Sequence, residues 1–297
     1  MKRGYVIIAS TAVLLVVLGG FGYAMRGQIR DTIAEARKPD LPAAVPYESA
    51  NVNAASAPAP APTTPKNVNV APPPPKNVNT NAPAANTNSN APVVNTNVNA
   101  APAPVAQPVA YNLAVPWTVQ APFANWTGSY EDGCEEASAL MVHYYYSKQV
   151  FDSQQESKDE LDKIFAWENT RYGYNLNTTA EETATTIREY FGYTTVVVTE
   201  EVTAARIKSE IAAGRPVIVP AYGKALNNPN FKNGGPVYHM LVVKGYTANT
   251  FITDDPGTRK GADYVYPIST ILNAAHDWND GDTEHGRKVM IVVHPNW

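Results

Sequence analysis

The middle of the chain constrains its folding most. Residues 49–112 contain thirteen Pro and no Gly, and their only charged residues are Lys66 and Lys76. Such a stretch cannot bury enough apolar surface to offset the entropy lost on ordering its backbone. Because Pro is frequent and Gly is absent, we predict a semi-extended, disordered linker over residues 38–112. Folded parts of the chain must then lie before or after this linker.

The N-terminal segment has the composition of a membrane helix. Residues 4–25 carry no charge and are largely apolar. A helix rises about 1.5 Å per residue, so about 20 such residues cross the roughly 30 Å hydrocarbon core of a bilayer. We therefore predict a transmembrane anchor with a juxtamembrane stretch over residues 1–37. A cleaved signal peptide is the alternative, since Gly22 and Ala24 are small residues at the relative positions that cleavage requires.

The orientation of this anchor is set by features other than charge. Lys and Arg lie on both sides of the apolar run, so the positive-inside count does not favour an external C-terminus. The very short N-terminal tail and the polar linker do favour it. We expect a single-pass protein of the cell membrane whose C-terminal domain is extracytoplasmic, or a secreted protein if the segment is cleaved.

Residues 113–297 are predicted to form one domain of ordinary size. They hold fifteen Lys or Arg against twenty-three Asp or Glu, a net charge of −8. That balance argues against nucleic-acid binding, which requires clustered Lys and Arg. The single Cys of the chain excludes an intramolecular disulfide framework and any multi-Cys metal site.

No cofactor, metal or partner subunit is expected. Asp280, Asp282 and Glu284 resemble a calcium loop only faintly, and no helix signature follows them. The linker contains no coiled-coil heptads, so we expect a monomer.

Helical patterns come first in the domain and strand patterns follow. Helices are expected from Cys134, from the capping-box sequences at Ser157 and Thr178, and over about residues 200–213. The expected strands cover residues 193–199, 217–219, 238–246, 250–253, 264–266 and 289–293. This order predicts an α+β fold, with an antiparallel sheet, helices gathered on one of its faces and the Cys134 helix packed centrally.

Cys134 is the candidate nucleophile. It follows Gly133 at the predicted start of a helix, where the macrodipole and unpaired N–H groups favour a thiolate. The acidic residues between Glu131 and Glu136 act in the opposite direction, because nearby carboxylates raise the pKa of a thiol. A lone Cys is also often a small, buried hydrophobic residue. Its function therefore depends on the groups around it.

A thiol nucleophile needs a base, and the base needs an orienting group. Of the five His, His143 faces away from Cys134 on the same helix, and three others lie in a charged tail region. His239 begins an apolar strand, and the next strand runs into Asp254 and Asp255. If the two strands pair as a hairpin, the start of the first lies beside the end of the second. We therefore predict that His239 and Asp255 meet.

Gln120 is the candidate donor for an oxyanion. It ends a short strand-like run before the Cys134 loop. Its side-chain amide, together with the backbone N–H of Cys134, would supply the donors that stabilise a negative oxygen. An isolated Gln is most often a surface residue, so the order Gln120, Cys134, His239, Asp255 is more informative than any one member.

The sequence blocks around these residues resemble a known family. The blocks are Pro116…Gln120…Gly133-Cys134-Glu135-x-Ala137-Ser138, Gly214-Arg215-Pro216-Val217, Tyr238-His239-x-Leu241-Val242-Val243-x-Gly245-Tyr246 and Asp255-Pro256. They are similar to the peptidase family C thirty-nine-like domains, papain-fold relatives of the proteases that remove double-glycine leaders from bacteriocins. The resemblance covers nearly all of residues 113–297 and none of residues 1–112.

The resemblance implies a papain-like cysteine peptidase fold and assigns four roles. Cys134 would be the nucleophile, His239 the general base, Asp255 the group that orients the base, and Gln120 the oxyanion donor. Asp255 is preferred over Asp254 because the family places this Asp directly before Pro.

We therefore expect a membrane-tethered, extracytoplasmic cysteine peptidase that hydrolyses a peptide or protein substrate through a thioester acyl-enzyme. One alternative is an acyltransferase or transglutaminase-like enzyme, which keeps the fold and nucleophile but changes the acceptor. The other is a catalytically inactive papain-like fold that acts as a cell-surface binding module. The acidic surroundings of Cys134 favour this last alternative.

Overall fold

The computed structural model describes residues 40–47 and 107–296. The predicted membrane anchor and most of the predicted linker lie outside these residues. Among the helices that the structure does describe, none combines the length and apolar character that spanning a bilayer requires. The compact unit that carries the candidate site extends from Val45, and its core takes in Tyr47 as well as Tyr111. It therefore includes residues that precede the domain start predicted at residue 113.

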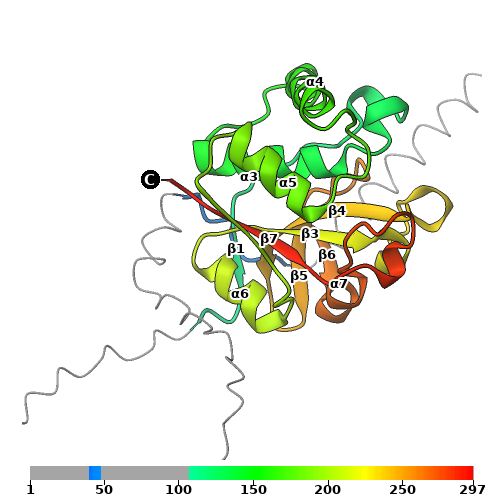
Figure 1. The fold of residues 1–297 in the computed structure, drawn as a ribbon. Coiled ribbons are helices and arrows are strands. Elements are labelled where there is room, and N and C mark those ends of the chain that lie inside the picture. Colours follow the sequence, from blue (N-terminus) through cyan, green and yellow to red (C-terminus); the bar gives the residue numbers. More distant parts are fainter. Residues whose placement is uncertain (1–39, 48–106, 297) are drawn as a thin grey trace, which may run out of the picture. The chain divides into compact units, whose positions relative to one another are not determined.

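The strands of this unit form one antiparallel sheet in the order β2-β7-β3-β4-β5-β6, with β1 also paired to β4 (Figure 1). The strands are β1 (Tyr111–Asn112), β2 (Thr195–Thr199), β3 (Val217–Tyr222), β4 (Tyr238–Tyr246), β5 (Thr250–Asp254), β6 (Tyr264–Pro267) and β7 (Met290–His294). The strand expected over residues 238–246 matches β4 residue for residue. All nine residues of β4 are buried, so this strand lies at the centre of the core.

Helices cover both faces of the sheet. They are α3 (Cys134–Ser147), α4 (Gln154–Arg171), α5 (Ala180–Glu189), α6 (Ala204–Ala212) and α7 (Ile268–Ala274). Figure 1 shows α3, α4 and α5 on one face and α6 and α7 on the other. The α+β fold with an antiparallel sheet is confirmed, but the expectation that all helices share one face is wrong. The physical reason is the continuous burial of β4, whose apolar side chains project to both faces and need cover on each.

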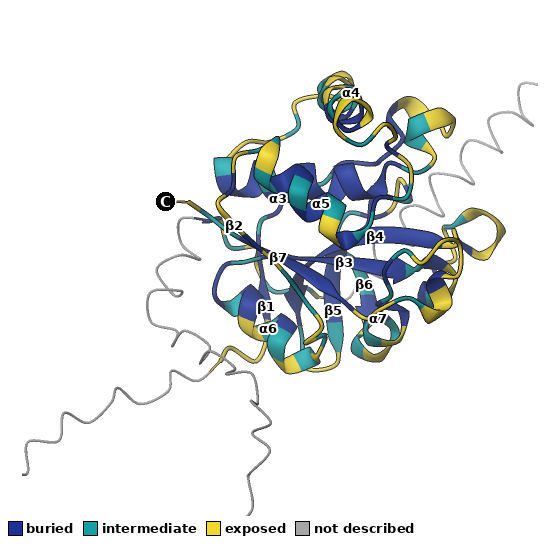
Figure 2. Cartoon of the chain, in the orientation of Figure 1, coloured by how far each residue is buried: buried dark blue, intermediate teal, exposed yellow. Residues whose placement is uncertain are grey.

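The helix starts show how local hydrogen bonds set boundaries. Thr179 forms a reciprocal capping box with Glu182 at the start of α5, one residue after the Thr178 signal. The capping box expected at Ser157 is wrong, because α4 begins earlier, where the Ser153 hydroxyl accepts a hydrogen bond from the Glu156 backbone N–H at 3.1 Å. Helix α3 is buried along most of its length (Figure 2), which agrees with the central position expected for it.

Residues 45–47, which precede the predicted start of the domain, are held to the domain by backbone hydrogen bonds and ring packing. The Val45 N–H donates to the Asn112 carbonyl at 2.9 Å. The Tyr47 ring packs edge-to-face on Tyr145 and Tyr146, with ring centroids 5.4 Å and 5.1 Å apart. These contacts join a segment before residue 48 to the helix that begins at Cys134.

Replacing Tyr47 by Ala is expected to lower the free energy of unfolding by about 3 kcal/mol, because a buried aromatic ring is lost and a cavity remains. Urea unfolding followed by circular dichroism measures this change. Val150→Ala, at a side chain that is 65% exposed, serves as the control and should change stability little. Equal stability of the Tyr47 variant and the parental chain would show that residues 45–47 do not belong to the folded core.

Candidate functional site

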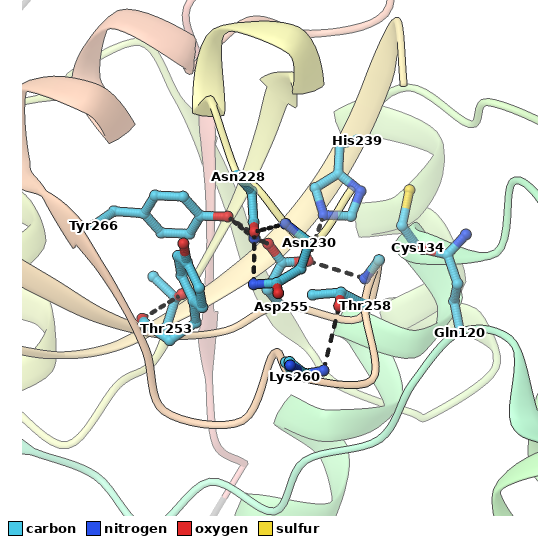
Figure 3. A network of polar contacts seen from close by, with 12 residues as sticks. Gln120, Cys134, Asn228, Asn230, His239, Thr253, Asp255, Thr258, Lys260 and Tyr266 are labelled. Carbon is cyan, nitrogen blue, oxygen red and sulfur yellow. Dashed lines mark hydrogen bonds and ion pairs between the residues drawn. The ribbon is translucent and has the colours of Figure 1, made fainter. Parts of the chain in front are cut away.

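The structure brings the four predicted site residues into one region (Figure 3). Cys134 is the first residue of α3, and His239 is the second residue of β4. Asp255 directly follows β5, and Gln120 lies in the segment before α3. Sheet pairing places Asp254, the last residue of β5, opposite Val242 in the middle of β4, and the chain then continues through Asp255 toward the start of β4, where His239 lies.

His239 and Asp255 form a buried hydrogen bond. The distance between His239 Nε2 and Asp255 Oδ1 is 2.8 Å, and the two side chains are 1% and 0% exposed. An ionised carboxylate only accepts hydrogen bonds, so Nε2 carries a proton, and in the neutral imidazole Nδ1 is then an acceptor. Figure 3 shows the Nδ1 side of the ring turned toward Cys134. The pair therefore presents a basic nitrogen on the side where the thiol lies.

Several donors hold the Asp255 carboxylate. The Tyr266 hydroxyl donates to Oδ2 at 2.6 Å, and the Gly257 backbone N–H donates to Oδ1 at 2.9 Å. The Asn228 amide also reaches Oδ2, at 3.4 Å. Burial by itself would raise the pKa of Asp255, but His239 and the hydrogen bonds outweigh it and lower the pKa below its usual value. Asp255 is therefore a charged group fixed in a dry site.

The neighbouring Asp254 has a different environment. Its carboxylate lies 3.5 Å from the Lys244 ammonium and accepts a hydrogen bond from the Asp263 backbone N–H at 3.1 Å. Burial raises the pKa of Asp254 to about 6, although Lys244 opposes the shift. Successive residues of an extended chain project to opposite sides, which explains why only Asp255 meets His239.

Cys134 starts its helix in a confined position. An added Cβ at Gly133, the preceding residue, would lie 2.9 Å from the Phe165 ring and 3.0 Å from the Ser129 carbonyl oxygen. Only glycine fits there without displacing a neighbour. The Cys134 side chain is 3% exposed, and its Sγ–H donates to Glu135 Oε2 at 3.0 Å. The thiol in this structure is thus paired with a carboxylate.

Burial raises the pKa of the Cys134 thiol well above its ordinary value, and the charge of Glu135 raises it further. The backbone of Met240, the residue after His239, acts in the opposite direction. The effects of burial and of the acidic neighbours therefore exceed the effect of the helix start, and the thiol is protonated. A thiolate requires either the removal of these charges or the transfer of the proton to a base.

Three buried glutamates lie near Cys134, the candidate nucleophile. Glu135, Glu136 and Glu168 are each 1% exposed. Burial raises the pKa of Glu135 to about 8, and burial followed by repulsion from Glu168 raises the pKa of Glu136 well above its usual value. The pKa of Glu168 is also raised by burial, and Thr186 donates to its carboxylate at 2.7 Å. Protons shared within this cluster offset the cost of burying three acids.

The Gln120 side chain is buried and already occupied. Its Nε2 donates to the carbonyl oxygens of Tyr130 and Glu131 at 3.1 Å and 2.8 Å. Its Oε1 is buried without a partner among the described residues. The amide therefore holds the loop that leads to Cys134. One of its two N–H groups would have to leave a carbonyl before it could donate to an oxyanion.

The other histidines take structural positions. His143 stacks on Phe191 with ring centroids 4.4 Å apart, and burial lowers its pKa. His276 contacts the Gly286 carbonyl, and the exposed His285 contacts Asp282. Within residues 40–47 and 107–296, no group of three or more His, Cys, Asp or Glu side chains is arranged to hold a metal ion.

Sequence reasoning missed three groups that complete the site. Tyr266 and Asn228 bind Asp255 from β6 and from the segment after β3, and the Asn228 amide also donates to the Tyr266 hydroxyl at 2.7 Å. Glu168 joins the carboxylate cluster from the far end of α4. The only sequence signal for these groups was that the strand after Asp255 contains Tyr264 and Tyr266. Strand pairing alone does not show which of the two reaches the Asp255 carboxylate.

Comparison with known proteins assigns the family. The family model described as the Peptidase_C39 like family matches residues 112–281, more than half of the chain. The chain belongs to this family. The match includes Gln120, Cys134, His239 and Asp255. A search of curated proteins found no significant match.

The chain is also similar to a solved structure from Bacillus anthracis, of a protein provisionally assigned as a C39-like peptidase. The two share 14% sequence identity, and the alignment covers 62% of this chain and 96% of the other, with a TM-score of 0.38. These values are too low for the likeness to support an argument about fold or chemistry.

Replacing Gly257 by Ala is expected to displace the His239 ring, because the added Cβ would lie 2.7 Å from its Cε1 atom. A hydrogen-bonded Nε2 proton exchanges slowly with water and is visible by proton NMR. That resonance should be lost or broadened in the variant. Gly192→Ala is the control, since its Cβ meets nothing although its φ is +80°. A sharp, unshifted resonance in both variants would contradict the tight packing of Gly257 against His239.

Replacing Glu135 by Gln is expected to lower the pKa of the Cys134 thiol. The charge of Glu135 raises that pKa when the carboxylate is ionised, and a neutral amide removes this repulsion. The rate of iodoacetamide alkylation should therefore rise at lower pH than in the parental chain. Glu131→Gln, at an exposed residue of the same loop, should leave the profile unchanged. A Glu135 profile that shifts to higher pH would show that the carboxylate assists ionisation.

Proposed function

We propose that this protein is a cysteine peptidase that hydrolyses peptide bonds through Cys134, His239 and Asp255. The observation that carries the proposal is the buried His239–Asp255 hydrogen bond beside a cysteine at a helix start. The family assignment supports the same chemistry. As in other papain-like peptidases, the thiol, the imidazole and the carboxylate would act as one unit.

The proposed reaction moves one proton through His239. Nδ1 accepts the Sγ proton as the thiolate attacks the substrate carbonyl carbon, and the imidazolium then gives that proton to the leaving amine nitrogen as the C–N bond breaks. A thioester remains on Cys134. Water, deprotonated by Nδ1, attacks the thioester carbonyl and releases the acid and the thiol. The buried, ionised Asp255 stabilises the imidazolium in both steps and fixes the ring orientation.

The resting contact between Cys134 and Glu135 sets a condition on this reaction. The Sγ–H must turn from Glu135 Oε2 toward His239 before proton transfer. Ionisation of the thiol next to His239 gains the attraction of the imidazolium, which offsets the repulsion from the glutamates. We propose that a bound substrate carbonyl favours this rearrangement by recruiting the Cys134 backbone N–H and one N–H of Gln120.

The proposed setting is a membrane surface. The uncharged run at residues 4–25 would anchor the chain, and residues 26–44 would connect it to the domain, because Val45 and Tyr47 already pack against the domain. The expected substrate is then an extracytoplasmic peptide or protein. Labelling of intact cells with a membrane-impermeant amine reagent tests this placement, since only an external domain would react before lysis.

The peptidase proposal predicts cleavage of a diverse peptide mixture by the full chain at neutral pH, detected by mass spectrometry as new termini. Cys134→Ala and His239→Ala should each abolish the new termini, because nucleophile and base act together. His143→Ala is the matched control and should retain cleavage. Cleavage that survives in Cys134→Ala would come from another source and would contradict the proposal.

A second candidate function is a non-catalytic binding module. The observations that favour it are the protonated Cys134 paired with Glu135 and the occupied donors of Gln120. The thiol pKa separates the two functions. A pKa that does not change on His239→Ala supports the binding module, whereas a change shows that thiol and imidazole are coupled. Addition of a primary amine separates hydrolysis from acyl transfer, because a transferase would form the amide product.

A further inference from the structure

A pocket of about 300 Å³ lies along the segment that contains Gln120. Its wall includes Trp117, Val119 and Ala121, and the start of α4 contributes Ser153 and Ser157. The wall is joined to the candidate site by two hydrogen bonds. The Trp117 indole N–H donates to the Asp255 carbonyl at 3.1 Å, and the Gln120 backbone N–H donates to the Pro256 carbonyl at 3.0 Å. The pocket and the candidate site therefore share the segment from Trp117 to Ala121.

One cation and no carboxylate line the pocket. The cation is Arg259, which is exposed. Among the arginines of residues 40–47 and 107–296, Arg259 alone has no hydrogen bond or ion pair with another residue that the structure describes. A guanidinium without an internal partner, in a domain with an excess of acid, is available for an external anion.

A second lining residue has donors to spare. The Oε1 of Gln154 accepts the Phe123 backbone N–H at 2.8 Å, which leaves its amide N–H groups without a partner among the described residues. The Ser153 hydroxyl also lines the pocket; it accepts the Glu156 backbone N–H, which leaves its own O–H to donate. The Ser157 hydroxyl already donates to the Ser153 carbonyl at 3.3 Å. The free donors are therefore those of Arg259, Gln154 and Ser153, while Trp117 and Val119 supply apolar surface. This combination fits a short apolar stem that ends in a carboxylate.

The turn that carries Arg259 is fixed to the candidate catalytic Asp. The Asp255 backbone N–H donates to the Gly261 carbonyl at 3.0 Å, and the Gly261 N–H donates to the Thr258 carbonyl at 3.1 Å. An added Cβ at Gly261 would lie 1.7 Å from the Asp255 carbonyl oxygen, so the turn can close only with glycine there. The backbone at Arg259 is therefore held in a set position relative to Asp255.

The segment that lines the pocket also holds backbone strain. Ala124, a lining residue, and its neighbour Phe123 both have φ of +57°, a region that non-glycine residues seldom adopt. The surrounding structure must maintain this strain.

We propose that this pocket binds a carboxylate of the peptide substrate, with Arg259 as the residue that selects it. This inference rests on the proposed peptidase function and adds a substrate class to it. The carboxylate has two sources, an Asp or Glu side chain near the bond to be cleaved, or the C-terminal carboxylate of the peptide.

Binding to the full-length Cys134→Ala chain tests the proposal without cleavage. The probes are three pools of pentapeptides labelled with an uncharged BODIPY dye, whose other positions are random but exclude Asp and Glu: one with a fixed Glu and an amidated end, one with Gln in its place, and one with Gln and a free C-terminal carboxylate. Fluorescence polarisation should show at least one carboxylate pool binding about tenfold more tightly than the amidated Gln pool, and the preference should weaken with salt. The pool that binds more tightly identifies whether the bound carboxylate is a Glu side chain or the C-terminus of the peptide.

Two further substitutions in the Cys134→Ala chain test whether Arg259 causes the preference for carboxylate peptides. Arg259→Gln should reduce it to below about twofold, and Arg259→Lys should restore part of it, since Lys keeps the charge but not the planar fork. Lys260→Gln is the matched control, because this neighbouring cation does not line the pocket. Equal binding of all three pools, or equal losses in Arg259→Gln and Lys260→Gln, would overturn the proposal.

The outcome also separates this inference from the peptidase proposal. A chain that cleaves the peptide mixture with no Arg259-dependent preference remains a peptidase without this pocket function. A chain that binds carboxylate peptides through Arg259 but cleaves none keeps the pocket and loses the peptidase function.

Discussion

The candidate site depends on one buried charge, the carboxylate of Asp255. An ionised carboxylate with no solvent access is stable only where donors replace its lost hydration. Those donors come from separate elements: His239 from β4, Tyr266 from β6, and Gly257 from the turn after β5. These donors meet at Asp255 because β5 lies between β4 and β6 and pairs with both. The fold thereby keeps the buried Asp255 carboxylate ionised. A buried His–Asp pair without the other donors would instead favour the uncharged carboxylic acid.

The sequence was sufficient to predict the contact between His239 and Asp255, which follows from strand pairing. It was insufficient to predict the contacts of Tyr266 and Glu168, which follow from side-chain packing. Strand periodicity located β4 and β5, and hairpin geometry then brought His239 to Asp255. Tyr266 and Glu168 carry no such signal, since each reaches the site through side-chain length and tertiary packing. The start of α4 illustrates a third case. Ser153 and Glu156 have the same spacing as a capping box, but so does Ser157 with Glu160, and only tertiary context selects between them.

The carboxylates behind Cys134 and the pair in front of it act on the thiol in opposite directions. Burial of the thiol favours its protonated form, and the charges of Glu135 and Glu136 favour it further. An imidazolium at His239 favours the thiolate. On the proposed function, a nucleophile held between these two environments would stay protonated at rest and would ionise only beside its base. Such a balance would protect the single thiol of the chain from oxidation, since oxidants react with the thiolate.

The turn from Asp255 to Gly261 connects the candidate site to the pocket. Its first residue binds His239, and its tip carries Arg259, which lines the pocket. The turn is closed by hydrogen bonds between Asp255, Thr258 and Gly261. On the proposed function, a carboxylate bound at Arg259 would therefore be held by the same turn that positions Asp255. Substrate selection and catalysis would then share one element, and a substrate with the matching charge would gain in both binding and alignment.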